Sequence, residues 1–338
     1  MPVSDDVVVN AYRFLFGREP ENQDVIALNS KAQDWQDLRN AFIHSDEFKN
    51  GIAQTLSLGG KAPIGQHMNE RDNDVEVHCS PEQLQMMFDG IARNWKQFGD
   101  TEPHWSVLTN PVFFKDKLPQ YLDAFFAHGQ IDVEHALSYL ARAGLPATGF
   151  DRAMDFGCGV GRLTVALAPH TRSIVGVDIS PSHLREAEKT MAAKSIRNAK
   201  FQQIRMVDDI DGLGTFDFIF SRIVLQHNPP PIMAAIYRKL LGVLRPGGVA
   251  VIQIPTYLKG RPFSVDAYLS GDAPDMEMNA LPQHEIFRII QEQGCITLEV
   301  RECTDLRDIH GISHTFVVQK VEAMKEKKRG WFQRSRNS

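Results

Sequence analysis

Residues 153–168 read AMDFGCGVGRLTVALA, and this stretch decides the fold. An apolar run reaches an acid at Asp155, and three glycines follow at alternate positions, Gly157, Gly159 and Gly161. The apolar spacing after the glycines predicts a helix with one buried face. A strand that ends in a glycine turn and leads directly into a helix is typical of the first unit of a doubly wound nucleotide-binding sheet.

The spacing of these glycines discriminates between ligands. A dinucleotide-binding turn has the order G-x-G-x-x-G, but position 162 is Arg and the third glycine comes one residue early. Glycines at such a turn let a ligand approach the backbone N–H groups at the helix start. Close packing of strand against helix also demands glycine, so the turn alone leaves a purely structural interpretation open.

Three features farther along the chain strengthen the signal of the glycine turn, and the first of them supports a nucleoside ligand. Asp178 ends a predicted strand at residues 173–177, where a carboxylate can accept both ribose hydroxyls of an adenosine. The sequence FDFIFS at 216–221 is followed by IVLQH at 223–227, and LRPGGV at 244–249 precedes a fifth predicted strand. The next motif, QHNPPP, lacks an aromatic residue after its prolines, which argues against the N-P-P-Y motif of amino-methylating enzymes.

Taken together, these motifs cover about residues 150–255 and resemble the class I S-adenosylmethionine (SAM) methyltransferases, whose turn reads D-x-G-x-G-x-G. The resemblance implies an α/β fold: a Rossmann-like, seven-stranded, doubly wound sheet with its last strand antiparallel. The region before the sheet is predicted to be all-α. SAM is the cofactor that the resemblance implies, with S-adenosyl-L-homocysteine (SAH) as the product.

The resemblance also assigns cofactor contacts to particular residues. It places Asp155 near the methionine amino group and the three glycines of the turn against the methionine moiety. It places Asp178 on the ribose, Ile179 beside the adenine, and Ser221 against the cofactor through its backbone. A further acid normally contacts the adenine amino group after the third strand. Here strict spacing offers Arg205, and we favour Asp208 on its chemistry, with Asp209 as the alternative.

Candidates for a catalytic base are histidines. His227 follows the fourth strand, where the family often places a histidine near the acceptor, and His104 precedes the sheet in a segment rich in turn formers. His310 and His314 in the last part of the chain are further candidates, and a structural role competes for each of the four. We expect no metal site, because no cluster of metal-binding residues has ligand spacing.

Composition disfavours several other classes of protein. The net charge of −5 gives no global case for nucleic-acid binding. The four cysteines form no C-x-x-C pair, which favours reduced thiols and a cytoplasmic location. The first residues have neither a basic nor an apolar segment, so we expect no signal peptide. No apolar stretch is long enough to span a bilayer.

The chain is expected to contain five segments. Residues 1–50 form a small helical module, 51–75 a linker, 76–147 a helical cap with two helices at 118–126 and 133–143, and 148–320 the methyltransferase domain. AYRFLFGREPENQDV at 11–25, with SDEF at 45–48, resembles a helical domain of unknown function often attached to cell-surface glycosyltransferases. The basic tail at 321–338 is interpreted as solvated, with a weak contact to an anionic membrane surface as the alternative.

The sequence thus predicts a SAM-dependent methyltransferase that acts on an oxygen or nitrogen of a small-molecule or saccharide acceptor, in surface-glycan assembly by analogy with the module. Two alternatives stay open: a non-catalytic SAM-binding protein, and an NAD-dependent oxidoreductase that the glycine spacing disfavours.

Overall fold

The computed structural model describes residues 3–16, 18–48, 73–271, 276–303 and 311–321. Most of the predicted linker, the predicted basic tail beyond Val321, and His310 lie outside the described residues. The chain divides into two compact units, residues 1–72 with 307–310, and residues 73–306 with 311–338.

The N-terminal unit is helical, as predicted. Its helices are α1 (Asp5–Phe16), α2 (Gln23–Asn29) and α3 (Trp35–Ile43). Asn22 and Asp34 cap the second and third helices by accepting hydrogen bonds from backbone N–H groups of the first turn. Tyr12 and Phe42 pack edge to face with ring centroids 5.1 Å apart in its small core.

A seven-stranded sheet forms the centre of the second unit, in the order β3-β2-β1-β4-β5-β7-β6. The first five strands are mutually parallel, and β7 runs antiparallel to both of its neighbours, as the sequence predicted. The strands are β1 (Phe150–Phe156), β2 (Thr171–Asp178), β3 (Ala199–Gln203), β4 (Phe216–Ser221), β5 (Leu244–Leu258), β6 (Cys295–Cys303) and β7 (Gly311–Lys320).

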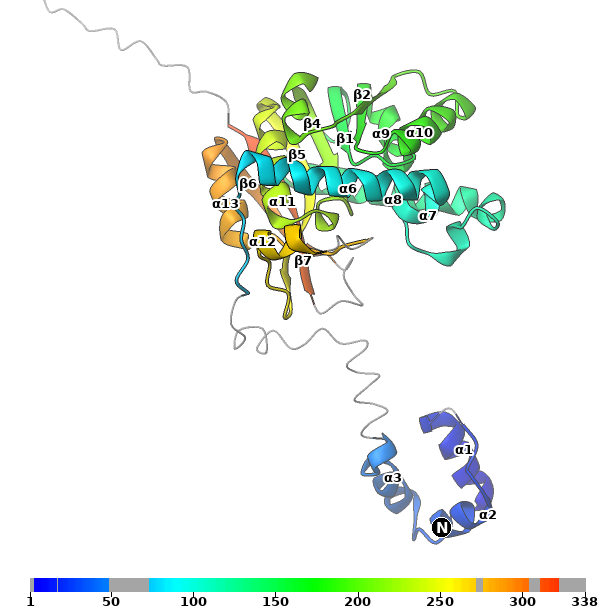
Figure 1. The fold of residues 1–338 in the computed structure, drawn as a ribbon. Coiled ribbons are helices and arrows are strands. Elements are labelled where there is room, and N and C mark those ends of the chain that lie inside the picture. The colour runs from blue at the N-terminus through cyan, green and yellow to red at the C-terminus, as the bar shows by residue number, and fades with distance from the viewer. Residues whose placement is uncertain (1–2, 17, 49–72, 272–275, 304–310, 322–338) are drawn as a thin grey trace, which may run out of the picture. The chain divides into compact units, whose positions relative to one another are not determined.

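Helices cover both faces of this sheet, and α6 runs across it (Figure 1). One apolar cluster packs α8 and α9 on the first face, and a larger one packs α6, α11 and α13 on the other. The helices are α6 (Pro81–Thr101), α7 (Pro103–Val107), α8 (Leu118–Arg142), α9 (Arg162–Leu167), α10 (Pro181–Ala193), α11 (Pro230–Gly242), α12 (Val265–Ser270) and α13 (Gln283–Glu292).

Two local predictions were wrong. The two helices expected at 118–126 and 133–143 are one continuous helix, α8. Gly129 does not break it, since this glycine is where α8 approaches α9: a Cβ there would lie 2.7 Å from the carbonyl oxygen of Arg162. The turn-rich segment with His104 contains a helix, α7, which begins at Pro103.

Candidate functional site

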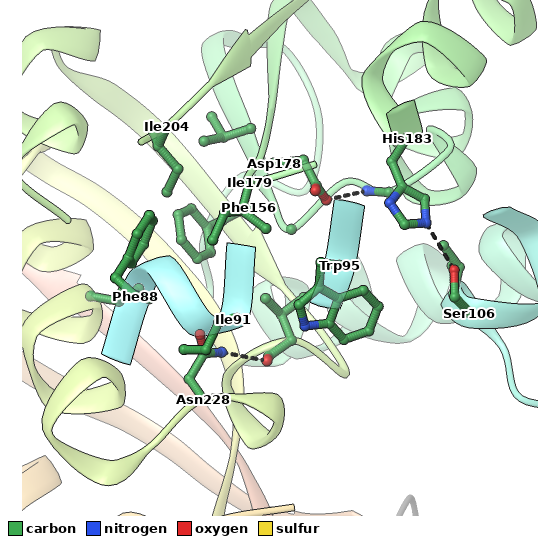
Figure 2. Close-up of a pocket in the computed structure, with 16 residues that line it drawn as sticks. Phe88, Ile91, Trp95, Ser106, Phe156, Asp178, Ile179, His183, Ile204 and Asn228 are labelled. Atoms are coloured by element: carbon green, nitrogen blue, oxygen red, sulfur yellow. Dashed lines mark hydrogen bonds between the residues drawn. The ribbon is translucent and has the colours of Figure 1, made fainter. Parts of the chain in front are cut away.

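A pocket lies at the carboxyl ends of β1 and β2, beneath α6 and α7 (Figure 2). Phe88, Phe156 and Ile204 face one another at one end, and Trp95, Ser106 and His183 lie at the other. The pocket is lined by Phe88, Ile91, Trp95, Ser106, Val107, Phe156, Gly157, Gly159, Val177, Asp178, Ile179, His183, Ile204, Val224, Asn228 and Ile236.

The glycine turn between β1 and α9 forms part of the pocket wall. Gly157 and Gly159 have φ angles of 74° and 52°, a left-handed region that disfavours other residues. A Cβ on Gly157 would lie 2.3 Å from a Val224 methyl group, and one on Gly159 would lie 2.5 Å from a Val107 methyl group. The two glycines therefore admit close neighbours to the backbone.

Gly161 and Cys158 have structural roles in this turn. Gly161 faces α10 and does not line the pocket, and a Cβ there would lie 2.9 Å from Cε of Met191. Cys158 is 3% exposed, and burial raises the pKa of its thiol well above the usual range. Its Sγ lies 3.8 Å from the carbonyl oxygen of Gly159.

Asp178 presents its carboxylate to the pocket from the end of β2. Its Oδ2 accepts a hydrogen bond from the Gly159 N–H at 2.8 Å, and its Oδ1 accepts one from the Ser180 N–H at 2.8 Å. Each carboxylate oxygen has two acceptor positions, so each keeps one for a ligand. Two hydroxyl donors on adjacent carbons, as in a ribose, match this arrangement.

Asp155 is fully buried at the end of β1 and is not among the residues that line the pocket. Its Oδ2 accepts a hydrogen bond from the Thr164 hydroxyl at 2.6 Å, whereas its Oδ1 has no hydrogen-bond partner. Burial raises the pKa of Asp155 to about 6, against the lowering effects of Thr164 and Arg162. A buried carboxylate oxygen without a donor is a position at which a cationic or hydrogen-bonding ligand group gains a strong contact.

The raised pKa of Asp155 predicts a pH-dependent effect on folding without ligand. The folded state holds this proton up to about pH 6 and the unfolded chain releases it near pH 4, so wild-type stability falls as pH rises through this window. Asp155→Asn cannot ionise. We expect the variant to gain on the order of 2–3 kcal/mol relative to wild type between pH 4 and pH 7. Urea unfolding at both pH values measures the gain, and an equal difference at the two would contradict the prediction.

The other predicted cofactor residues differ in their position. Ile179 lines the pocket. Ser221 is buried below it and donates its hydroxyl hydrogen to the Phe156 carbonyl at 3.0 Å. Asp208 is exposed, forms an ion pair with Lys239 at 2.8 Å and does not line the pocket. The Asp209 carboxylate instead accepts hydrogen bonds from the backbone N–H groups of Arg205 and Met206.

His227 belongs to a buried chain of hydrogen bonds that fixes its tautomer. The Ile223 N–H donates to Gln253 Oε1 at 2.8 Å, and Gln253 Nε2 donates to Gln226 Oε1 at 3.1 Å. The remaining Gln226 Nε2 faces His227 Nε2 at 3.3 Å, and His227 Nδ1 lies 2.9 Å from the Glu277 carbonyl oxygen. The Ile223 N–H can only donate, which fixes the orientation of both glutamine amides and makes Gln226 Nε2 a donor to His227 Nε2. The Glu277 carbonyl can only accept, so the imidazole proton belongs on Nδ1.

This series of hydrogen bonds predicts that the His227 imidazole stays neutral in mildly acidic solution. Burial lowers its pKa to about 4, although the Glu277 carbonyl acts in the opposite direction. We expect the imidazole nitrogen resonances of His227 to show the neutral Nδ1–H tautomer from pH 8 down to pH 5. Multiple-bond ¹⁵N–¹H spectra measure this, and the spectrum of His227→Asn identifies the signal. A titration midpoint near 6.5 would contradict it.

The two predicted catalytic histidines are not among the described residues that line the pocket. His227 instead contacts the edge of the Trp95 ring, with centroids 5.4 Å apart. His104 packs against Phe125, and burial lowers its pKa. Of the further candidates, His314 lies in β7 with its Nδ1 2.9 Å from the Thr256 hydroxyl.

Sequence reasoning missed several residues that line the pocket. Trp95 belongs to an apolar stripe that predicts only core packing, yet it forms one end of the pocket. His183 and Ser106 come from α10 and α7, and their side chains meet at 2.8 Å. His183 lies five residues after Asp178, in the helix that begins at the same sheet edge. That position is the one signal in the sequence that could have found it.

Within the described residues, no group of three or more metal-binding side chains is placed to hold an ion. In the same part of the chain, no helix combines the length and the apolar character needed to cross a membrane.

Comparison with known proteins adds a family match. Residues 153–248 match the model described as "Methyltransferase domain". The trans-aconitate 2-methyltransferase of Deinococcus radiodurans is 33% identical over 116 residues, which make up 33% of this chain and 40% of that protein. A ubiquinone biosynthesis O-methyltransferase of Xanthomonas campestris pv. campestris is 30% identical over 115 residues, 33% of this chain and 45% of that protein.

Each of these two matches thus spans less than half of the relative's own length. Among solved structures, the N-methyltransferase NodS of Bradyrhizobium japonicum WM9, in complex with SAH, is 17% identical. The alignment covers 69% of this chain and 100% of that one with a TM-score of 0.45.

Proposed function

We propose that this chain, which carries a class I SAM-dependent methyltransferase domain, transfers the SAM methyl group to an oxygen or nitrogen of a small-molecule or saccharide acceptor. The observation that carries the proposal is the site at the ends of β1 and β2. There, a glycine turn, an unpartnered buried carboxylate oxygen and a pocket-lining carboxylate lie within one sheet edge.

The residues present fit this cofactor. Asp155 Oδ1 supplies an acceptor for the methionine ammonium group, directly or through water. Gly157 and Gly159 leave the backbone accessible, and Asp178 has two acceptor positions left for the ribose hydroxyls. Ile179 and Ile204 provide apolar walls for the adenine. Asp208 has no part in this proposal, because its carboxylate pairs with Lys239 outside the pocket.

SAM supplies an activated methyl group on a sulfonium sulfur, so the protein's own contribution is binding, orientation and exclusion of water. Holding two reactants in line can supply about 7–11 kcal/mol of a barrier. α6 contributes apolar walls to the pocket, with Trp95 at one end. This proposal assigns a proton-accepting role to neither His104 nor His227, since the two rings lie outside the pocket lining.

Three considerations support the choice of acceptor. The names of the two relatives denote methyl transfer to small molecules, and one of them specifies oxygen. The sequence of the N-terminal unit resembles a module that accompanies enzymes of cell-surface saccharides, which supports a role in surface-glycan assembly by association. A net charge of −5 gives no global attraction for nucleic acid.

Calorimetric titration of the full chain with SAM, SAH and NADH tests the cofactor part of this proposal. We expect SAM and SAH to bind at micromolar concentration and NADH to show no heat of binding. Binding of NADH alone would favour an oxidoreductase and overturn the proposal. Transfer of labelled methyl from SAM to small-molecule and saccharide acceptors tests the reaction, and SAM binding without turnover on any acceptor would favour a non-catalytic SAM-binding protein.

A further inference from the structure

The motif QHNPPP at 226–231, to which the proposed function gives no role, places the side chain of Asn228 in the pocket. Asn228 follows the short 3₁₀ helix η4 (Leu225–His227) and precedes Pro229. A residue before proline is restricted to extended backbone, and Asn228 has a φ angle of −123° and a ψ angle of 145°. The helical turn therefore ends at Asn228, and its side chain folds back onto the turn.

Two backbone carbonyls fix the orientation of the Asn228 amide. Nδ2 donates to the carbonyl oxygen of Val224 at 2.9 Å and to that of Leu225 at 3.3 Å. Because a carbonyl only accepts, the amide nitrogen must face these two groups, and Oδ1 is directed away from them. Within the residues that the structure describes, nothing donates to Oδ1, and this oxygen is not among the enclosed polar atoms that have no partner. Since Asn228 lines the pocket, its Oδ1 can accept a hydrogen bond from a ligand there.

Apolar side chains surround this acceptor. Figure 2 shows Asn228 and Phe88 on one side of the pocket and Asp178 on the other. Phe88 belongs with Phe156 and Ile204 to one apolar cluster, and the three side chains form the apolar end of the pocket. A flat ring can pack between such walls, and a single acceptor at its edge favours a ring that carries a donor there.

The other polar side chains of the pocket lie elsewhere or already have a role. Among the described lining residues, these side chains are Trp95, Ser106, Asp178 and His183. Ser106 and His183 contact each other at 2.8 Å at the opposite end of the pocket. Trp95 lies at that end too, and its indole N–H only donates. Asp178 holds the ribose in the proposed function, so Asn228 Oδ1 is the side-chain acceptor left for the apolar end.

We propose that Asn228 Oδ1 accepts a hydrogen bond from the 6-amino group of the adenine, and that this contact selects adenine over a 6-oxo purine. The inference rests on the proposed function. A ribose on Asp178 and a methionine moiety on the glycine turn leave the apolar end, with Ile179 and Ile204, for the base. Asn228 thereby makes the contact for which the sequence favoured Asp208.

The fixed amide is what makes this contact selective. The 6-amino group of adenine donates to Oδ1, whereas a 6-oxo group would place a second acceptor against it and leave both without a donor. A site built around such a contact rejects a ligand that cannot make it. Rotation of the Asn228 amide would not help, because Nδ2 would lose the carbonyls of Val224 and Leu225, and Oδ1 would face them instead.

Calorimetric titration of the full chain with SAH and with its inosine analogue tests this contact. The two ligands differ only at the purine 6-position and in the proton on the neighbouring N1. We expect the wild-type protein to bind SAH at least about 30-fold more tightly than the analogue. Asn228→Leu has nearly the same volume and no acceptor, and should lower this preference at least about tenfold. The milder variant Asn228→Ser, which keeps a hydroxyl donor beside the turn, should lower it by a similar factor.

Asn279→Leu is the matched control. The Asn279 N–H donates to the Gln226 carbonyl at 2.8 Å, so this residue adjoins the same 3₁₀ helix, but it does not line the pocket. We expect Asn279→Leu to keep the wild-type preference for SAH over the analogue. Thermal unfolding of each variant without ligand shows which of them fold.

The ratio of the two affinities separates base recognition from a general loosening of the pocket. Loosening weakens both ligands alike, so an unchanged ratio in folded Asn228→Leu or Asn228→Ser would overturn the inference. Wild-type affinities for SAH and the analogue within threefold of each other would overturn it without any variant, and would leave the proposed function intact. Failure of the wild-type protein to bind either ligand would overturn the proposed function and, with it, this inference.

Discussion

Asp178→Ala is expected to weaken SAH binding by at least about 100-fold. The carboxylate keeps one acceptor position on each oxygen for a ribose hydroxyl, after the Gly159 and Ser180 N–H groups have taken the others. A hydrogen bond to a charged group contributes about 1.5–3 kcal/mol, and 1.4 kcal/mol is tenfold in affinity. Two such bonds therefore correspond to a factor of about 10²–10⁴, measured by calorimetric titration.

The matched control for this substitution is Asp178→Asn. Its side chain keeps one acceptor oxygen, while its amide nitrogen, which only donates, faces either the Gly159 or the Ser180 N–H, so we expect it to keep one of the two ribose hydrogen bonds and to unfold at a lower temperature than wild type. Thermal unfolding of each variant without ligand separates a loss of binding from a collapse of the Gly159 turn. A dissociation constant within threefold of wild type for Asp178→Ala would contradict the assignment of this residue to the ribose.

Asp132→Asn is expected to destabilise the second unit by about 3–5 kcal/mol. The Asp132 carboxylate is the ion-pair partner of Arg162 at 2.6 Å, and the Arg162 side chain is only 2% exposed. Removing one partner of a buried pair leaves the other charge without compensation, which costs more than the pair itself contributes. Equilibrium urea unfolding measures the effect through a lower transition midpoint.

A double substitution distinguishes this cause from simple loss of packing. Asp132→Leu combined with Arg162→Met removes this pair and retains apolar volume, but leaves Arg222, 3.3 Å from Asp132 in the wild-type protein, without that carboxylate, so we expect it to recover part of the lost stability. Asp132→Leu alone should remain strongly destabilised. Equal stability of the single and double variants would show that the isolated charge on Arg162 is not the reason.

The place of the glycine turn could be predicted from local sequence, whereas the seven-stranded sheet with its antiparallel strand was implied by the resemblance that the motifs carry. The run before Asp155, the glycines after it and the acid at Asp178 are close in the chain, and each carries its own conformational signal. The break expected in α8 was wrong for a non-local reason. Gly129 is a weak helix residue in isolation, but its missing side chain lets α8 contact Arg162, and this contact is invisible in the sequence.

In the candidate site, too, residues with a local signal could be predicted and residues placed by non-local packing could not. Asp178 ends β2 and Ile179 follows it directly, so their place at the edge of the sheet could be predicted from the sequence. Trp95, Ser106 and Val107 come from helices far earlier in the chain, and only packing brings them to the glycines. Asp208 was favoured as the adenine contact because of its chemistry. Its exposed carboxylate instead forms an ion pair with Lys239 on α11.

The rate at which the buried Cys158 thiol is alkylated reports how often the glycine turn opens. Its thiol is 3% exposed and held in the protonated form, so an alkylating reagent can modify it only during a local opening of the turn. The rate of labelling at this position, read by peptide mass, thus counts openings of the cofactor site. A bound ligand that lies on Gly157 and Gly159 lowers the labelling rate of Cys158 by the factor by which it stabilises the closed turn.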